Sequence, residues 1–162
     1  YTDADCLKQD VNGISIVHAA CEAGKLEFVK RFISKFGKDC LKQTDNRGLT
    51  ALHYACISHN LELIEWLIAE HKLSLASTDS LGKTPLHYLA ENALENPALN
   101  LWEDIPALAE KFGIEYITDF LDSSGHSVKD YIERAVDQSK ILAAINRMCY
   151  HRQGDNPLFC AK

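Results

Sequence analysis

Cysteine and histidine are the residue types in this sequence that could carry covalent or metal chemistry. A thiolate beside an imidazole can act as a nucleophile, and both side chains can ligate zinc. Either chemistry needs one constellation of side chains, or a ligand spacing such as CxxC, and the sequence contains no CxxC pair. Seven histidines are present, together with six cysteines: Cys6, Cys21, Cys40, Cys56, Cys149 and Cys160.

The positions of these residues recur along the chain. Cys21 and Cys56 are 35 residues apart, and each follows a histidine by three residues. A catalytic nucleophile occurs once per site and does not recur at such an interval. We therefore predict no catalytic, cofactor-binding or metal-binding residues, and we expect Cys160 to be an ordinary surface thiol. A structural role is expected for five repeated residues: His18, His53, His87, Cys21 and Cys56.

A repeated pattern of glycine followed five residues later by histidine organises the chain. It occurs in the segments 13–21, 48–56 and 82–90, and a fourth copy starting at Gly125 has Asp130 in the place of histidine. The successive glycines are separated by 35, 34 and 43 residues. An apolar residue follows eleven residues after the histidine position in three copies, at Val29, Ile64 and Ile141. A period of this length predicts a stack of small structural units.

The residues of this pattern resemble the ankyrin repeat family over roughly residues 10–150. Thr84-Pro85-Leu86-His87 is the TPLH motif of that family intact, and residues 50–53 differ from it only in lacking the proline. The resemblance implies an all-α solenoid of stacked helix–turn–helix units with β-turn-like finger loops. We expect four units, one to four, at 10–45, 46–79, 80–122 and 123–150, followed by a tail at 151–162. Residues 5–9 are identical to residues 39–43, which close the first unit, so residues 1–9 are interpreted as the remnant of an earlier repeat.

The first helix of each unit carries start signals. Thr50 and Thr84 stand at N-cap positions, and Pro85 stands at the first helical position, where its missing N–H costs nothing. The resemblance implies that the motif histidine bonds to this threonine and to the backbone of the neighbouring repeat. Asp130 in unit four could accept such a bond but could not donate one while ionised.

The third unit contains an insertion at residues 93–100, between its two helices. Asn96-Pro97 predicts a helix start, Pro106 predicts a kink or restart, and residues 114–121 are apolar enough for an extra helical turn. We expect the insertion to form a second contact surface or an intrachain cover for unit three. Trp102 is expected in the core, and Trp66 in the core or half-buried.

Composition excludes several classes of function. The net charge of −6 disfavours direct binding to nucleic acid, and no run of about 18 apolar residues is present to cross a membrane. Reduced, buried thiols fit an intracellular, reducing compartment. We expect a monomer, and the absence of an initiator methionine indicates a fragment of a longer polypeptide.

The resemblance implies binding of another protein through the turn tips and the exposed concave face of the first helices. The apolar members at these positions are expected to face solvent in a line, although packing between repeats is an equal alternative. The predicted partner-binding residues are Asn12, Ile14, Asn46, Arg47, Leu49, Ile57, Ser58, Ser80, Leu81, Lys83, Glu91 and Asn92; family positions also include Val11, Glu22, Ala23, Ser123, Ser124, His126, Arg134 and Ala135.

Two other functions are weighed against this one. The chain is alternatively a regulatory or targeting segment of a larger enzyme, including a secreted bacterial effector that acts in the cytosol of a host cell. Intrinsic catalysis is the least favoured, because the candidate nucleophiles are repeated.

Overall fold

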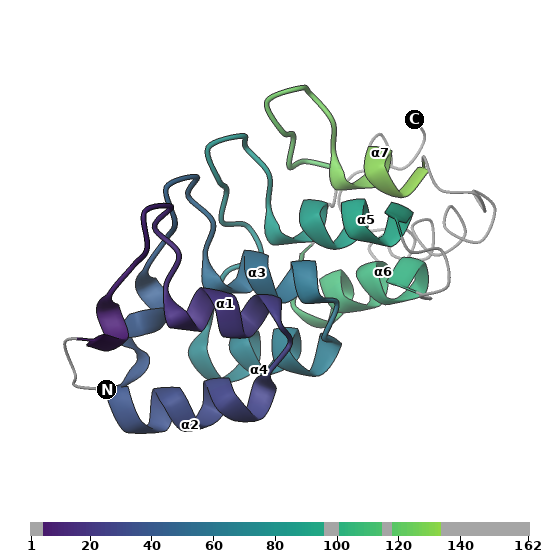
Figure 1. Ribbon diagram of the computed structural model, residues 1–162. Helices are drawn as coiled ribbons and strands as arrows, with labels where there is room; N and C mark the ends of the chain where they lie inside the picture. The colour runs from purple at the N-terminus through teal and green to yellow at the C-terminus, as the bar shows by residue number, and fades with distance from the viewer. Residues whose placement is uncertain (1–4, 96–100, 115–117, 134–162) are drawn as a thin grey trace.

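The computed structural model describes residues 5–95, 101–114 and 118–133, and it confirms an all-α solenoid (Figure 1). The described part contains no strand beyond two isolated bridges, Gln9 to Ser15 and Leu121 to Ser127. Its elements in chain order are the 3-10 helix η1 (Asp5–Leu7), α1 (Ile16–Glu22), α2 (Leu26–Phe36), the 3-10 helix η2 (Lys38–Lys42), α3 (Ala51–Ser58), α4 (Leu61–His71), α5 (Pro85–Glu95), α6 (Leu101–Lys111) and α7 (Val128–Glu133).

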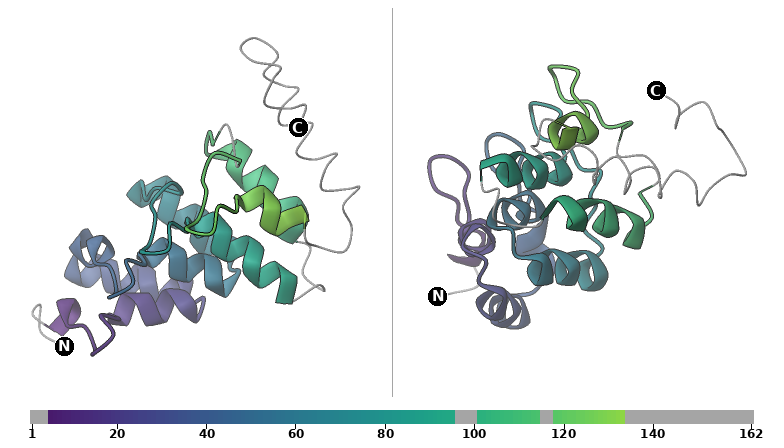
Figure 2. Two further views of the ribbon diagram at one scale, coloured as in Figure 1. Left: turned by 90° about the horizontal axis from the view of Figure 1, so that it is seen from above. Right: turned by 90° about the vertical axis from the view of Figure 1, so that its right-hand side faces the viewer.

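The helices form two rows. The inner row contains α1, α3, α5 and α7, each packed on the next, and the outer row contains α2, α4 and α6, each packed on the inner helix of its own unit (Figures 1 and 2). The turns that precede the inner helices project side by side from one edge of the stack. A single unit cannot bury its apolar stripe alone, so stacking supplies the core.

Capping starts the short inner helices where the motif predicts. In α1 the backbone N–H of Ser15 donates to Nδ1 of His18 (3.2 Å), and the N–H of His18 donates to Oγ of Ser15 (3.3 Å). The N–H of Thr50 donates in the same way to Nδ1 of His53 (3.1 Å). Helices of 7 and 8 residues are too short to be stable alone, so these caps and the packing between units hold them.

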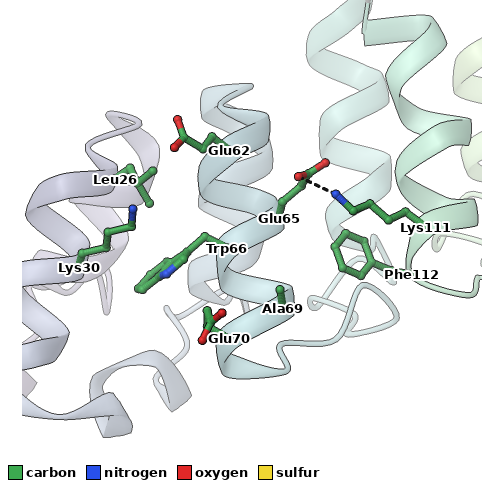
Figure 3. Close-up of a pocket in the computed structure, with 9 residues that line it drawn as sticks. All are labelled: Leu26, Lys30, Glu62, Glu65, Trp66, Ala69, Glu70, Lys111 and Phe112. Carbon is green, nitrogen blue, oxygen red and sulfur yellow. Dashed lines mark ion pairs between the residues drawn. The ribbon is translucent and has the colours of Figure 1, made fainter.

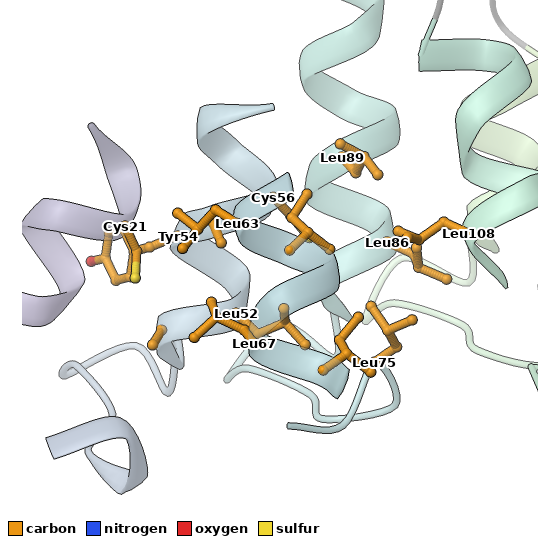
Figure 4. Close-up of a cluster of buried hydrophobic side chains, with 14 of the residues drawn as sticks. Cys21, Leu52, Tyr54, Cys56, Leu63, Leu67, Leu75, Leu86, Leu89 and Leu108 are labelled. Atoms are coloured by element: carbon orange, nitrogen blue, oxygen red, sulfur yellow. The ribbon is translucent and has the colours of Figure 1, made fainter. Parts of the chain in front are cut away.

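The core runs the length of the stack between the two rows (Figure 4). Leu52, Leu67 and Leu86 are fully buried, and Cys21 and Cys56 lie among them as small apolar side chains. Each fully buried leucine contributes about 1.5–3 kcal/mol relative to an exposed one. The core is therefore continuous across the repeats, which makes each unit depend on its neighbours.

The two copies of the pentapeptide at 5–9 and 39–43 contact each other. Nε2 of Gln43 donates to the carbonyl of Leu7 (2.8 Å), and Nε2 of Gln9 donates to the carbonyl of Thr44 (2.8 Å). Each copy contributes to a 3-10 helix, η1 or η2. Residues 5–9 of the segment interpreted as a remnant therefore contact the residues at the end of unit one.

The third unit departs from the expected layout in three ways. The first residues of the insertion, 93–95, extend α5 to 11 residues, against 8 in α3. Helix α6 continues through Pro106, which is buried, so the expected restart does not occur within residues 101–111. The expected helical turn at 114–121 is wrong for its described part, because residues 118–121 form a turn and the bridge from Leu121 to Ser127. These residues form the stem of the next turn and are therefore not available to a helix.

Several expectations fall outside the described residues. They are the helix start at Asn96-Pro97, the outer helix of unit four, the tail at 151–162, and the side chains of Asn92 and Trp102.

Candidate functional site

Each projecting turn is built around an aspartate. One carboxylate oxygen of Asp45 accepts from the backbone N–H of Arg47 (2.9 Å) and of Leu49 (2.8 Å). Asp10, Asp79 and Asp122 accept in the same way from the residues two and four positions later. The glycine three positions after each aspartate has a positive φ, from 71° to 83°, which an L side chain rarely adopts. The four tips therefore share one rigid geometry.

Neighbouring turns are joined by single backbone hydrogen bonds. The N–H of Asn46 donates to the carbonyl of Asn12 (2.9 Å), that of Ser80 to Arg47 (2.8 Å), and that of Ser123 to Leu81 (2.7 Å). These bonds set the spacing between successive tips.

A tyrosine from the inner helix supports each of three turns. The hydroxyl of Tyr54 donates to Oδ2 of Asp45 (2.9 Å), and Tyr88 and Tyr131 donate likewise to Asp79 (2.6 Å) and Asp122 (2.7 Å). Burial alone would raise the pKa of Asp45, but the N–H of Leu49, the Tyr54 hydroxyl and Arg47 outweigh it and lower that pKa. These pairs were not predicted from the sequence, although aspartate and tyrosine recur nine residues apart in units two, three and four.

The motif histidines connect each unit to the next. Nδ1 of His53 accepts from its own cap, so Nε2 carries the proton and donates to the carbonyl of Lys83 in the next unit (3.2 Å). His18 and His87 make the equivalent bonds to the carbonyls of Gln43 (3.1 Å) and His126 (3.2 Å). Burial lowers the pKa of all three imidazoles and keeps them neutral.

Asp130 replaces the histidine in unit four and keeps only half of its role. Its Oδ2 accepts from the N–H (2.6 Å) and the hydroxyl (2.8 Å) of Ser127, as expected for an ionised acceptor. A carboxylate has no proton to donate onward. The cap is thus preserved while the forward bond is lost.

A charged cluster lies at the base of the turns of units three and four. Nζ of Lys83 pairs with Glu91 (2.9 Å) and lies 5.4 Å from the ring centroids of both Tyr88 and Tyr131. Burial alone would lower the pKa of Lys83, but the bond and charge of Glu91 raise it by more. The ammonium group is therefore held charged and in one place on the inner-helix side.

Comparison with known proteins agrees with this architecture. A family model described as "Ankyrin repeats (3 copies)" matches residues 2–79. Residues 2–79 are ankyrin repeats, and the same helical unit recurs in the structure through residue 133. The TPLH-type caps, the turn glycines and the forward histidine bonds all lie where the sequence resemblance placed them.

Three curated proteins are similar to parts of this chain. The probable 26S proteasome regulatory subunit p28 of Saccharomyces cerevisiae is 29% identical over 149 residues, covering 75% of this chain and 64% of p28. A putative ankyrin repeat protein of Rickettsia felis is 32% identical over 85 residues, covering 51% and 38%. The palmitoyltransferase AKR1 of Candida glabrata is 33% identical over 57 residues, covering 35% of this chain and 8% of that protein. The chain thus spans less than two thirds of each of these relatives.

The expected line of exposed apolar residues is only partly present on the ankyrin array. Leu49 is fully buried, so the expectation that it faces solvent is wrong, and it offers no surface to a partner. It belongs to the core, against which the half-buried Ile14 and Ile57 pack. These three residues therefore pack on or in the core and do not form a line of exposed apolar side chains.

The remaining predicted residues divide by exposure. Leu81 is 50% exposed at the tip of unit three, and Val11 is 91% exposed at the tip of unit one. The polar tip residues Asn12, Asn46, Arg47 and Ser80 are exposed, whereas Ser58, Lys83 and Glu91 are half-buried. In unit three the structure pairs Lys83 with Glu91, and the exposed Leu81 precedes Lys83 by two residues in the same turn.

The cysteines of the array lie in a structural environment. Cys21, Cys40 and Cys56 are buried, and burial, with a smaller effect of Cys40, raises the pKa of the Cys21 thiol to about 12. A thiol with so high a pKa is a poor nucleophile at neutral pH. Within residues 5–95, 101–114 and 118–133, no three histidine, cysteine or acidic side chains gather as a metal site, and no helix is long and apolar enough to cross a bilayer.

Proposed function

We propose that this ankyrin array binds a partner protein through the concave face of its inner helices and the tips of its turns, centred on unit three. Ankyrin repeats generally mediate protein–protein interaction. The single observation that carries the proposal is the Lys83 cluster, in which one ammonium group is held by Glu91 and lies near two tyrosine rings. A side chain that is already ordered loses little conformational entropy when a partner docks.

The tip beside this cluster supplies an apolar contact. Leu81 is half exposed although the turn around it is rigid, since its N–H donates to Oδ1 of Asp79 (2.9 Å). An exposed leucine on a fixed turn next to a fixed charge offers both hydrophobic burial and a directional ion pair. The side chain of Arg47 is exposed in the turn of unit two, so the proposed binding surface extends from unit three to unit two.

Affinity capture from a reducing cell lysate, read by mass spectrometry, tests the proposal. We expect Leu81→Glu and Lys83→Met each to lose a protein that the wild-type array retains. Phe28→Glu is the matched control, because Phe28 is also about half exposed but lies on the outer helix α2. Leu49→Glu is unsuitable because it would place a charge in the core.

Circular dichroism and a urea titration of each variant separate lost binding from lost folding. The proposal fails if folded Leu81→Glu and Lys83→Met retain every protein that the wild type retains. Loss caused equally by Phe28→Glu would also contradict it.

A second candidate is that the array is a regulatory or targeting segment of a larger protein. The match to AKR1, a palmitoyltransferase of which it covers 8%, favours this arrangement. The Rickettsia relative is named only for its repeats and gives no support to an effector role. The name of p28 suggests a regulatory assembly as a partner class, which the captured proteins would reveal. The sequence of the full-length gene tests the second candidate, which fails if the rest of the chain holds no further domain.

A further inference from the structure

The outer row of helices carries a hollow of about 310 Å³ that the concave face does not include. It is bounded by α2, α4 and α6, with α4 between the other two (Figure 3). Glu62, Trp66 and Glu70 follow one another at intervals of four residues on α4, so they share one face of this helix. Figure 3 shows the indole of Trp66 lying between Glu62 and Glu70 and directed toward α2.

The indole of Trp66 already attracts one cation. Nζ of Lys30, from α2, lies 5.9 Å from the ring centroid of Trp66, and the indole is only half-buried. A tryptophan face is the strongest side-chain partner for a cation through its quadrupole. The structure therefore already contains one cation–π contact at Trp66, the type of interaction by which this surface would bind a further cation.

The charges around the hollow do not cancel. Lys30 pairs with Glu27 (3.3 Å), and Lys111 pairs with Glu65 (2.8 Å), so both lysines are neutralised by other carboxylates. Neither Glu62 nor Glu70 has a salt-bridge partner in the part of the chain that the structure describes, and both are exposed. Two unpaired negative charges thus stand beside an accessible aromatic ring.

We propose that this hollow binds an arginine side chain from a basic segment of a partner protein. A guanidinium is planar, so it can lay its flat face on an indole while the N–H groups at its edge make paired bonds to flanking carboxylates, a geometry that a compact ammonium does not provide. Leu26 and Phe112 border the hollow and provide apolar surface for the aliphatic stem. The net charge of −6 adds long-range attraction for a basic segment. The site is separate from the concave face, so two segments can bind at once.

Binding of a defined peptide tests this proposal. The probe is a labelled, acetylated and amidated peptide of alternating alanine and arginine, and its control carries neutral citrulline in place of every arginine. Fluorescence anisotropy at low salt gives the affinity, and the indole N–H resonance of Trp66, assigned with Trp66→Phe, reports the location. We expect the arginine peptide to bind and to shift that resonance, and the citrulline peptide to do neither.

Isosteric variants determine which charges matter. Glu62→Gln/Glu70→Gln should weaken the arginine peptide by about fivefold. Glu103→Gln should not, although Glu103 is likewise an exposed carboxylate of the outer row without a salt bridge among the described residues. Lys30→Gln should strengthen binding, because it removes a cation that competes for the ring of Trp66.

Several results would overturn the proposal. Equal affinity for the citrulline peptide, or equal weakening by Glu103→Gln, would indicate non-specific attraction. Weakening by Lys30→Gln, or tighter binding of a glutamate peptide, would show that the hollow prefers anions. Loss with Leu81→Glu while Trp66 gives no signal would assign the peptide to the concave face, which leaves the proposed function intact and removes this site.

Discussion

The hydroxyl of Tyr54 donates a hydrogen bond of 2.9 Å to Oδ2 of Asp45, the residue that organises the turn preceding the helix of Tyr54. Asp45 uses its other oxygen, Oδ1, for two backbone N–H groups, so this carboxylate fixes both the turn and the orientation of the helix. The pairs Tyr88–Asp79 and Tyr131–Asp122 repeat the arrangement. Position 19 holds alanine where a tyrosine would complete the series, so the turn of unit one lacks this support.

Replacing Tyr54 with phenylalanine should destabilise the array by about 1–3 kcal/mol, since a charged acceptor loses a buried donor. Tyr88→Phe should cost less, because Tyr88 is half-buried and water can reach Asp79 after the change. Urea titration measures both values, and an unchanged m-value would show that the extent of unfolding is the same. Equal costs for the two variants would argue against burial as the source of the difference.

Acidification should destabilise the array in two steps. Burial lowers the pKa of His18, His53 and His87 below 6.5, the ordinary value for histidine. The unfolded chain therefore takes up these protons first, so stability is complete above about pH 6.5 and declines as the pH falls toward the folded pKa values. The free energy of unfolding between pH 7 and 5 measures this step. His53→Gln should flatten the slope, and a wild-type protein equally stable at both pH values would refute the prediction.

The second loss of stability on acidification comes from protonation of aspartates in the turns and at the helix cap. The pKa values of Asp45, Asp122 and Asp130 are lowered below 3.8, because their hydrogen bonds outweigh the effect of burial. Their contribution is present above about pH 4 and is lost as the pH falls through the folded pKa values. Asp130→Asn should reduce this second step alone, whereas an unchanged acid transition in that variant would argue against its contribution.

Alanine at Gly13 should be more damaging than alanine at Gly125. Both glycines have φ near +80° (79° and 77°), so either alanine incurs about 1–2 kcal/mol of left-handed strain. A Cβ at Gly13 would also lie 2.7 Å from the backbone N of Asn46, whereas one at Gly125 would meet nothing within 4 Å. We expect Gly13→Ala to cost at least about 1 kcal/mol more. Thermal unfolding of the two variants measures the difference, and equal costs would show that the neighbouring turn moves freely.

Cys21 and Cys56 should resist alkylation in the folded protein. Both are fully buried, and burial raises the pKa of each thiol. Iodoacetamide treatment at about pH 8 followed by peptide mass spectrometry should leave both unmodified until urea is added. Rapid modification of either residue under native conditions would mean that the unit opens locally on the time scale of the reaction.

The repeat predicts most of the fold because its signals are local. Thr84, Pro85 and His87 determine a helix start through contacts within four residues, and the same spacing recurs at Thr50 and His53. The period also identifies the histidines and cysteines as structural, which removes the enzyme and metal hypotheses for those positions.

Exposure was harder to predict than fold. Leu49 follows a turn glycine, as Ile14 and Lys83 do, yet only Leu49 is fully buried. Leu49 belongs to a core that several units share, so its burial depends on how the units pack, which is not encoded in the local motif. The charged hollow around Trp66 was missed for a related reason, since its residues come from three outer helices that the repeat pattern does not relate to one another.

The backbone bonds between turns imply that stiffness varies along the row. Turns one and two are tied by the Asn46–Asn12 backbone bond, and additionally by the side chain of Asn46 on Val11 and that of Gln9 on Thr44. In the described residues, one direct backbone bond joins turn two to turn three, and one joins turn three to turn four. At the end of the row that carries Leu81, the forward bonds of His53 and His87 therefore supply much of the connection between successive units. A change in the spacing of these turns would therefore be transmitted to the inner helices beneath them, through the same two histidines.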